Sequence, residues 1–106
     1  MMTSSADNPF AGLPLANRML APYPNPFSSD ARIAFSNEEA GNLRLTIYDI
    51  AGRRVKTLVN EWREAGNHQV WWDGSNESGQ DTAPGLYFAR YENSNHKDVR
   101  KLLKVR

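Results

Sequence analysis

The sequence of 106 residues contains no cysteine. This absence excludes a disulfide framework, a thiolate nucleophile and a zinc site built on cysteine. No apolar run approaches the roughly 18 residues that a membrane-spanning helix needs. The first residues, MMTSSADNPFAGL, lack both the basic and the apolar stretch of a signal peptide, so we expect an exported form to be a piece of a longer chain.

Residue patterns that carry catalysis or metal binding are also scarce. The chain has two histidines, His68 and His96, without the HxH or HxxxH spacing that brings metal ligands together, and we assign both to structural or surface roles. No serine lies in a GxSxG motif, and there is neither a P-loop nor a GxGxxG motif. We therefore predict no enzymatic activity, no catalytic residue, no metal site and no cofactor.

The distribution of charge is uneven along the chain. A formal net charge of +1 argues against a nucleic-acid binder, which needs a basic face. The last ten residues, KDVRKLLKVR, nevertheless hold five basic side chains and one acidic one, a net charge of +4, which leaves −3 for residues 1–96. The candidate recognition residues in this segment are the basic ones: Lys97, Arg100, Lys101, Lys104 and Arg106.

Alternation of apolar and polar residues predicts strands at 32–36, 43–48, 53–59, 68–73, 86–91 and 97–105. Between Val55 and Leu58 the spacing indicates a bulge, and Glu61 to Glu64 could form one helical turn. Gly52 and Gly85 are expected in turns where a Cβ is costly. Six or seven short strands at intervals of about ten residues predict an all-β sandwich.

Within this sandwich the pattern also predicts which side chains face inward. The expected core consists of Phe35, Leu45, Ile47, Val55, Val70, Trp72, Leu86, Phe88 and Leu103. In the last strand, Val99 and Leu103 should face inward, with Val105 as a further candidate. Lys101 should lie near a sheet edge where its ammonium reaches water. We expect Arg100, Lys104 and Arg106 to form a solvent-accessible basic stripe.

The loop from Asp73 to Asp81 offers several oxygen ligands and two glycines, as a calcium loop would. It does not match the EF-hand pattern, and Asp-Gly and Ser-Gly are ordinary turn formers, so we favour turns over a calcium site. Of Trp71 and Trp72, which must face opposite ways, one can be exposed as a sugar-binding platform. We favour the alternative that the segment around Tyr23 and Phe27 covers it, both of these side chains packing down.

Several short motifs occur together in the last four-fifths of the chain. In order they are Tyr23-Pro24-Asn25-Pro26-Phe27, the Tyr48-Asp49-x-x-Gly52-Arg53 hairpin, Trp72-Asp73-Gly74, Pro84-Gly85-x-Tyr87 and the basic end. This combination resembles the type A C-terminal sorting domain of the type IX secretion system, a family that overlaps with the immunoglobulin-like domain of flagellar hook-capping proteins. Two departures from the family pattern are the proline directly before Gly85 and the Trp71-Trp72 doublet.

The resemblance implies an immunoglobulin-like β-sandwich of about seven antiparallel strands over residues 22–106. Residues 1–21 would be a linker or an added leading segment, with Phe10, Leu13 and Leu15 touching the domain. The resemblance also implies a domain of a Bacteroidetes-type bacterium that is exported through the periplasm to the cell surface or the medium. Its partners would be the outer-membrane secretion machinery with its sortase, and a cargo domain fused at its N-terminus. We expect no nucleic-acid partner, no membrane insertion and a monomer.

Three other functions stay open at this stage. The domain could be a carbohydrate-binding or structural accessory module of a secreted glycosidase or other hydrolase. It could hold a cargo protein on the cell surface without being cleaved. A hook-capping role would require a longer N-terminal region that associates with flagellar subunits.

Overall fold

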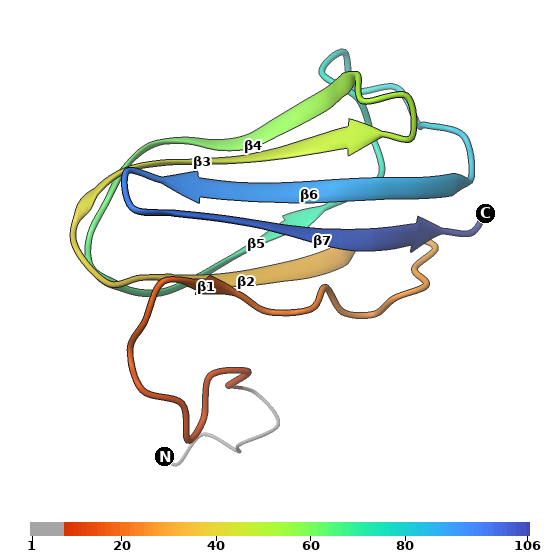
Figure 1. Ribbon diagram of the computed structural model, residues 1–106. Coiled ribbons are helices and arrows are strands. Elements are labelled where there is room, and N and C mark those ends of the chain that lie inside the picture. Colours follow the sequence, from red (N-terminus) through yellow and green to blue (C-terminus); the bar gives the residue numbers. More distant parts are fainter. Residues whose placement is uncertain (1–7) are drawn as a thin grey trace.

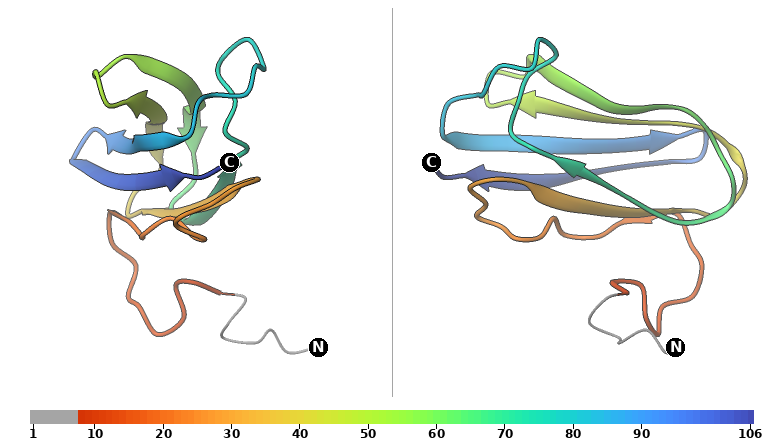
Figure 2. Two further views of the ribbon diagram at one scale, coloured as in Figure 1. Left: turned by 90° about the vertical axis from the view of Figure 1, so that its right-hand side faces the viewer. Right: turned by 180° about the vertical axis from the view of Figure 1, so that it is seen from behind.

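The computed structural model describes residues 8–106, which form two antiparallel β-sheets packed face to face (Figure 1). The three-stranded sheet has the order β1-β2-β5, and the four-stranded sheet has the order β4-β3-β6-β7. Viewed along the strands, the two layers are separate (Figure 2, left). The strands are β1 (Arg18–Met19), β2 (Ala31–Asn37), β3 (Gly41–Asp49), β4 (Arg54–Arg63), β5 (Gly66–Trp72), β6 (Gly85–Asn93) and β7 (His96–Lys104).

The predicted all-β sandwich is thereby confirmed. Residues 8–106 include no helix, and so none that could cross a membrane. Alternation along β3 explains the packing, because Leu43, Leu45 and Ile47 all point inward and are buried. They meet the inward face of β2, where Ile33 and Phe35 are fully buried. The apolar core thus lies between the two sheets.

Most of the predicted core is correct. Phe35, Leu45, Ile47 and Trp72 are completely buried, and two more residues pack against them while staying partly exposed: Val55 and Val70. In the last hairpin, the predicted inward-facing residues are each off by one position in the sequence. Leu86 and Phe88 are only half-buried, and Leu103 is 41% exposed. Their neighbours in the sequence fill the core instead: Tyr87, Ala89, Tyr91 and Leu102.

Pairing between β3 and β4 corrects the prediction around residues 61–64. Glu61 and Trp62 pair with Leu43 and Asn42 as continuing strand, so no helical turn forms there. The predicted bulge is confirmed, since the register between β3 and β4 shifts between Leu45 and Thr46 and again between Ile47 and Tyr48. The bulge lets a long β4 follow the twist of the sheet.

Short strand β1 falls inside the range 1–21, which we assigned from sequence to a linker. Its two residues, Arg18 and Met19, pair with Ser36 and Phe35 of β2. Met19 is fully buried and belongs to the core. Upstream of it Phe10 is also buried, whereas Leu13 and Leu15 are exposed. Residues 1–7, also part of the predicted linker, lie outside the described residues.

Candidate recognition surface on the carboxyl-terminal strand

Strand β7 lies at the edge of the four-stranded sheet and divides the basic residues between two faces (Figure 1). Lys97 and Lys101 alternate with Val99 and Leu103, and all four are exposed on the outer face. The outward orientation of Val99 and Leu103, like the 41% exposure of Val105, contradicts the predicted inward face. Paired residues of β6 explain it, because Leu86 and Phe88 accompany Leu103 and Lys101 on the outer side. The exposed surface is therefore both cationic and apolar.

Lys104 does not belong to a basic stripe, contrary to the prediction. Its side chain is only 2% exposed, and its ammonium donates a hydrogen bond of 2.6 Å to the carbonyl oxygen of Thr82. The Asp81 carboxylate lies 3.2 Å from the same nitrogen. A buried ammonium needs such partners, and the rim of the sandwich supplies them while the aliphatic stem fills the interior.

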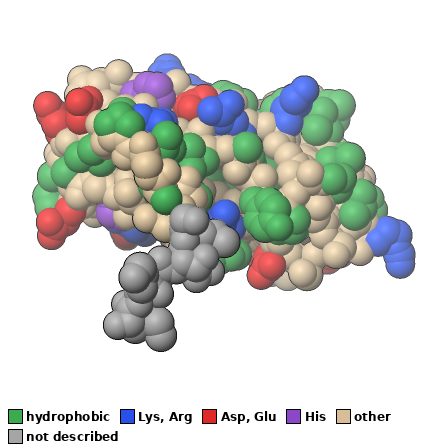
Figure 3. Space-filling view, turned by 90° about the horizontal axis from the view of Figure 1, so that it is seen from below, with side chains coloured by type: hydrophobic (Ala, Val, Ile, Leu, Met, Phe, Trp, Pro, Cys, Tyr) green, Lys and Arg blue, Asp and Glu red, His purple; other side chains and the backbone are tan. Residues whose placement is uncertain are grey.

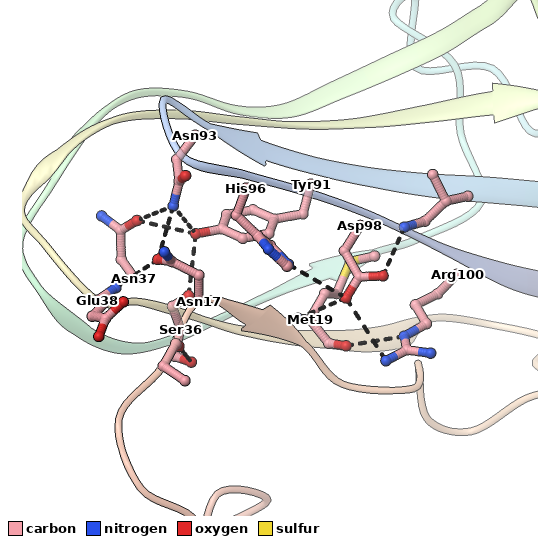
Figure 4. Close-up of polar contacts among 12 residues, drawn as sticks. Asn17, Met19, Ser36, Asn37, Glu38, Tyr91, Asn93, His96, Asp98 and Arg100 are labelled. Atoms are coloured by element: carbon pink, nitrogen blue, oxygen red, sulfur yellow. Dashed lines mark hydrogen bonds and ion pairs between the residues drawn. The ribbon is translucent and has the colours of Figure 1, made fainter.

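Arg100 also has a structural contact, although its side chain is 44% exposed. Its Nε donates to the carbonyl oxygen of Met19 at 3.0 Å, and the Met19 N–H donates to a carboxylate oxygen of Asp98 at 3.3 Å. Two side chains of β7 thus satisfy the backbone of one β1 residue (Figure 4). Lys97, Lys101 and Arg106 are exposed and form no ion pair with another described residue.

The proline segment, Tyr23–Phe27, borders the outer edge of β7. The Phe27 N–H donates to the Leu103 carbonyl at 2.9 Å, and the Val105 N–H donates to the Phe27 carbonyl at 2.8 Å. Phe27 itself is buried, with its ring centroid 5.4 Å from that of Trp72. The Asn25 side chain forms two further hydrogen bonds with β7: its Oδ1 accepts from the Leu103 N–H, and its Nδ2 donates to the Lys101 carbonyl. This segment therefore covers an edge that would otherwise expose unpaired backbone groups.

Tyr23 behaves differently from Phe27 and does not pack down as predicted. Its side chain is 66% exposed, because the residue forms a bridge with Arg32 on the outer side of β2. Trp71 is 54% exposed, so the expectation that the proline segment covers it is also wrong. Phe27 turns instead toward the core, where Trp72 lies.

The Trp72-Asp73-Gly74 motif shapes the loop that receives Lys104. The indole N–H of Trp72 donates to the Ser75 carbonyl at 2.8 Å. Asp73 Oδ1 accepts from the Ser75 hydroxyl at 2.6 Å and from its N–H at 3.0 Å, and these bonds lower the pKa of the Asp73 carboxyl. Gly74 has a φ of +83°, and a Cβ there would lie 2.5 Å from Cε of Lys104. Only glycine combines that backbone conformation with that contact.

Oxygen atoms in the Asp73–Asp81 loop are engaged by the backbone rather than directed to a common point. Asn76 Oδ1 accepts from the N–H groups of Ser78 and Gln80, at 2.9 and 3.0 Å. A carboxylate oxygen of Glu77 accepts from the Thr57 N–H at 2.8 Å. Within residues 8–106, no group of three or more His, Cys, Asp or Glu is placed to hold a metal ion. The loop is a series of side-chain-stabilised turns.

Two further motifs, one a hairpin turn and the other the start of β6, contain internal hydrogen bonds. Asp49 Oδ1 accepts from the N–H groups of Ala51 and Arg53, and its other oxygen lies 3.0 Å from the Arg53 Nε. Gly52 completes this hairpin with a φ of +83°. At the start of β6, the Tyr87 hydroxyl donates to the Ala83 carbonyl at 2.6 Å. Gly85 is the first residue of this strand, with a φ of +152°, so the prediction that it lies in a turn is wrong. The costly Cβ that we predicted at both glycines follows from these angles.

The family model described as the FlgD Ig-like domain matches residues 24–97. The chain belongs to this family. The matched range contains most of the motifs described above, from Pro24 of the proline segment to Tyr87. It ends at Lys97, so the family model does not reach most of β7. No curated protein matches the sequence.

Solved structures with similar folds include proteins of the type IX secretion system and flagellar FlgD proteins. PorZ from Porphyromonas gingivalis, a surface component of the type IX secretion system, superposes with a TM-score of 0.60 at 20% identity, over 86% of this chain and 12% of that one. Dimeric latent PorU from the same organism superposes with a TM-score of 0.59 at 19% identity; the match covers 85% of this chain and 10% of PorU. FlgD from Xanthomonas campestris, which takes part in hook capping during flagellar assembly, superposes with a TM-score of 0.56 at 24% identity. The match covers 84% of this chain and 67% of FlgD.

These likenesses show a shared immunoglobulin-like fold. The chain spans only about a tenth of the length of PorU and PorZ. The structure brings most of the predicted motif residues to one end of the sandwich, around the last residues of β7, while the Asp49–Arg53 hairpin keeps to its own turn.

Sequence reasoning missed the polar cluster at the other end of the sandwich (Figure 4). Asn93 donates through its amide nitrogen to Asn17, Asn37 and the Tyr91 hydroxyl. The Tyr91 hydroxyl lies 3.0 Å from Asn37 Oδ1, and burial raises the pKa of Tyr91. These asparagines are far apart in the chain, and no local motif marks them. Together they attach the segment before β1 to both sheets.

Proposed function

We propose that the domain is a non-catalytic C-terminal sorting domain, which directs an exported cargo protein through the outer membrane by a type IX secretion system. The exposed face of β7 is the proposed recognition surface. Four residues define it, two lysines and two aliphatic side chains: Lys97, Val99, Lys101 and Leu103. The proposed partner is an acidic, partly apolar surface of the secretion machinery.

The observation that carries this proposal is the alternation of cationic and apolar side chains on an exposed strand that the rest of the domain holds in place. An apolar side chain gains by leaving water, and a lysine beside it selects for negative charge. Fixing the strand in advance lowers the entropy that binding would cost. The fold likeness to a segment of PorZ and the sequence resemblance to sorting domains support the same assignment.

Export of a reporter fused to this domain tests the proposal. The host would be a bacterium with a functional type IX system, and the reporter would be measured in the medium and on the cell surface. The test variant is Lys97→Glu with Lys101→Glu, since both side chains are exposed and neither pairs with a described carboxylate. Deletion of residues 101–106 would be a poor test, because it removes the buried Leu102 and Lys104.

A matched control is Arg54→Glu with Arg18→Glu, which removes the same charge from β4 and β1. We expect export to fall at least several-fold in the β7 variant and to continue in the control, with both folded by circular dichroism. Equal export of the two variants would refute recognition through β7. The size of the exported reporter, on a blot, then tells whether the domain is removed or retained.

A further inference from the structure

The outer face of the three-stranded sheet carries a row of large side chains on the opposite layer from the surface proposed above. Trp71 of β5 is the register partner of Arg32 of β2, and Tyr23 forms a bridge to Arg32 from the other side. Directly opposed residues of antiparallel strands project to the same face and have Cβ atoms about 5 Å apart. Tyr23, Arg32 and Trp71 thus form the aromatic row.

Both rings of the aromatic row are open to solvent. The exposed fraction is 66% for Tyr23 and 54% for Trp71. The guanidinium carbon of Arg32 lies 5.6 Å from the centroid of the Tyr23 ring, a cation–π distance. The fold therefore presents two exposed aromatic side chains on either side of an arginine, whose cation lies over one of them.

The surrounding surface favours a negative ligand. The three strands of this sheet contain no Asp or Glu, and their sequences are RM, ARIAFSN and GNHQVWW. Arg32 forms no ion pair with a described residue. The carboxylates next to these strands in sequence are Asp30, Glu38 and Asp73. Glu38 follows the end of β2 that is farther from Arg32, and Asp73 is already bonded to Ser75.

Along β5 the same outer face continues with amide side chains. Gln69 and Asn67 alternate with inward residues and are both exposed. Each amide can donate and accept hydrogen bonds, as the hydroxyl groups of a sugar can. In the view from below, hydrophobic and basic side chains are spread along the face; several carboxylates lie toward the left, and one lies beside the large hydrophobic group right of centre (Figure 3).

We propose that this face binds an acidic polysaccharide. Trp71 and Tyr23 would stack on the C–H faces of sugar rings, because an aromatic face is electron-rich and attracts the partly positive hydrogens. Arg32 would pair with a carboxylate of a uronic acid, a geometry that its planar guanidinium fits. The proposal concerns a different sheet from β7 and does not depend on the sorting function.

Affinity electrophoresis of the folded domain through polygalacturonate tests this site. Highly methyl-esterified pectin is the matched probe, because it keeps the same sugar backbone without most of the charge. Trp71→Ala removes one of the two stacking rings, and Arg32→Gln removes the cation. Trp62→Ala is the control for the ring, since Trp62 is 56% exposed on β4, and Arg54→Gln is the control for the charge.

We expect polygalacturonate to retard the domain and esterified pectin to retard it much less. Trp71→Ala and Arg32→Gln should each raise the Kd for polygalacturonate roughly tenfold, equivalent to about 1.4 kcal/mol. Trp62→Ala and Arg54→Gln should leave it within about twofold. Absence of retardation, equal retardation by both polysaccharides, or equal losses in the control variants would each overturn the proposal. Circular dichroism and the Tm of each variant report whether its fold is intact.

Discussion

The side-chain amide of Asn25 takes the position of a strand residue beside Leu103. Its Oδ1 accepts the Leu103 N–H at 2.8 Å, and its Nδ2 donates to the Lys101 carbonyl at 2.9 Å. The peptide groups of β7 at this point have no neighbouring strand in the four-stranded sheet. One amide therefore satisfies a donor and an acceptor on an edge that would otherwise be open to another chain.

Asn25→Ala should lower the free energy of unfolding by about 1–2 kcal/mol, because two hydrogen bonds at a partly exposed site are lost. The Leu103 amide should also exchange its hydrogen faster. Urea denaturation and hydrogen exchange followed by NMR measure the two effects. Asn60→Ala is the control, since Asn60 is exposed on β4 and forms no side-chain hydrogen bond with a described residue. Unchanged exchange at Leu103 in Asn25→Ala would contradict this role.

Gly74 lies against the Lys104 side chain, and alanine substitutions can separate the cost of the steric contact from the cost of the backbone conformation. Gly74→Ala places a methyl group against the Lys104 stem and forces a left-handed backbone on alanine, which costs about 1–2 kcal/mol by itself. Gly79 has a similar φ, +81°, and no atom lies within 4 Å of a Cβ added there. Gly79→Ala therefore measures the backbone cost alone. We expect Gly74→Ala to be the more destabilising of the two in thermal unfolding. Equal shifts in Tm would show that the Lys104 side chain moves aside freely.

The predicted strands were mostly correct because each half-buried strand in the first part of the domain has a single apolar face. Leu43, Leu45 and Ile47 have polar neighbours, so period two determines which face is inward. In β6 both faces are apolar, with Leu86 and Phe88 on one side and the neighbouring tyrosines on the other. Alternation alone cannot choose between two such faces, and a shift of one residue reverses every side chain.

Long-range polar partners decide the choice in the last hairpin. Tyr91 can be buried because the Ser36 carbonyl and Asn37 Oδ1 of β2 lie 3.1 and 3.0 Å from its hydroxyl as acceptors. Lys104 can be buried because the Thr82 carbonyl receives its ammonium. Both sets of partners come from other segments of the chain. The same reason explains why β1 was missed, since two residues are too few for a period and the backbone of Met19 is satisfied by side chains of β7.

Tyr91→Phe tests how much the polar cluster contributes to stability. Loss of the buried hydroxyl leaves Asn37 and Asn93 short of a partner, so we expect the free energy of unfolding to fall by about 1–3 kcal/mol with an unchanged m value. Tyr48→Phe is the control, because Tyr48 is half-exposed and its hydroxyl bonds no described residue; it should change stability by less than about 0.5 kcal/mol. Equal effects of the two variants would argue against the cluster.

Acid should destabilise the domain through carboxylates that accept hydrogen bonds in the folded state. The backbone N–H of Arg53 is the largest cause that lowers the pKa of Asp49, and the Ser75 hydroxyl does the same for Asp73. For Glu92 the main cause is the hydrogen bond from Arg44. A lowered folded-state pKa means that the unfolded chain binds the proton more readily, so stability falls as pH decreases.

The stabilisation from Asp49 should be present above its ordinary pKa of 3.8 and disappear as pH falls through the lower folded-state value. Asp49→Asn has no such carboxylate to lose. We therefore expect it to be less stable than the unchanged domain at pH 7, with the two stability curves converging below about pH 3. Urea midpoints measured between pH 2 and 7 give both curves. Glu38→Gln removes an exposed carboxylate that accepts no hydrogen bond from a described residue, so its curve should run parallel to that of the unchanged domain. Parallel curves for Asp49→Asn would instead mean that the Asp49 carboxylate does not contribute to the acid dependence.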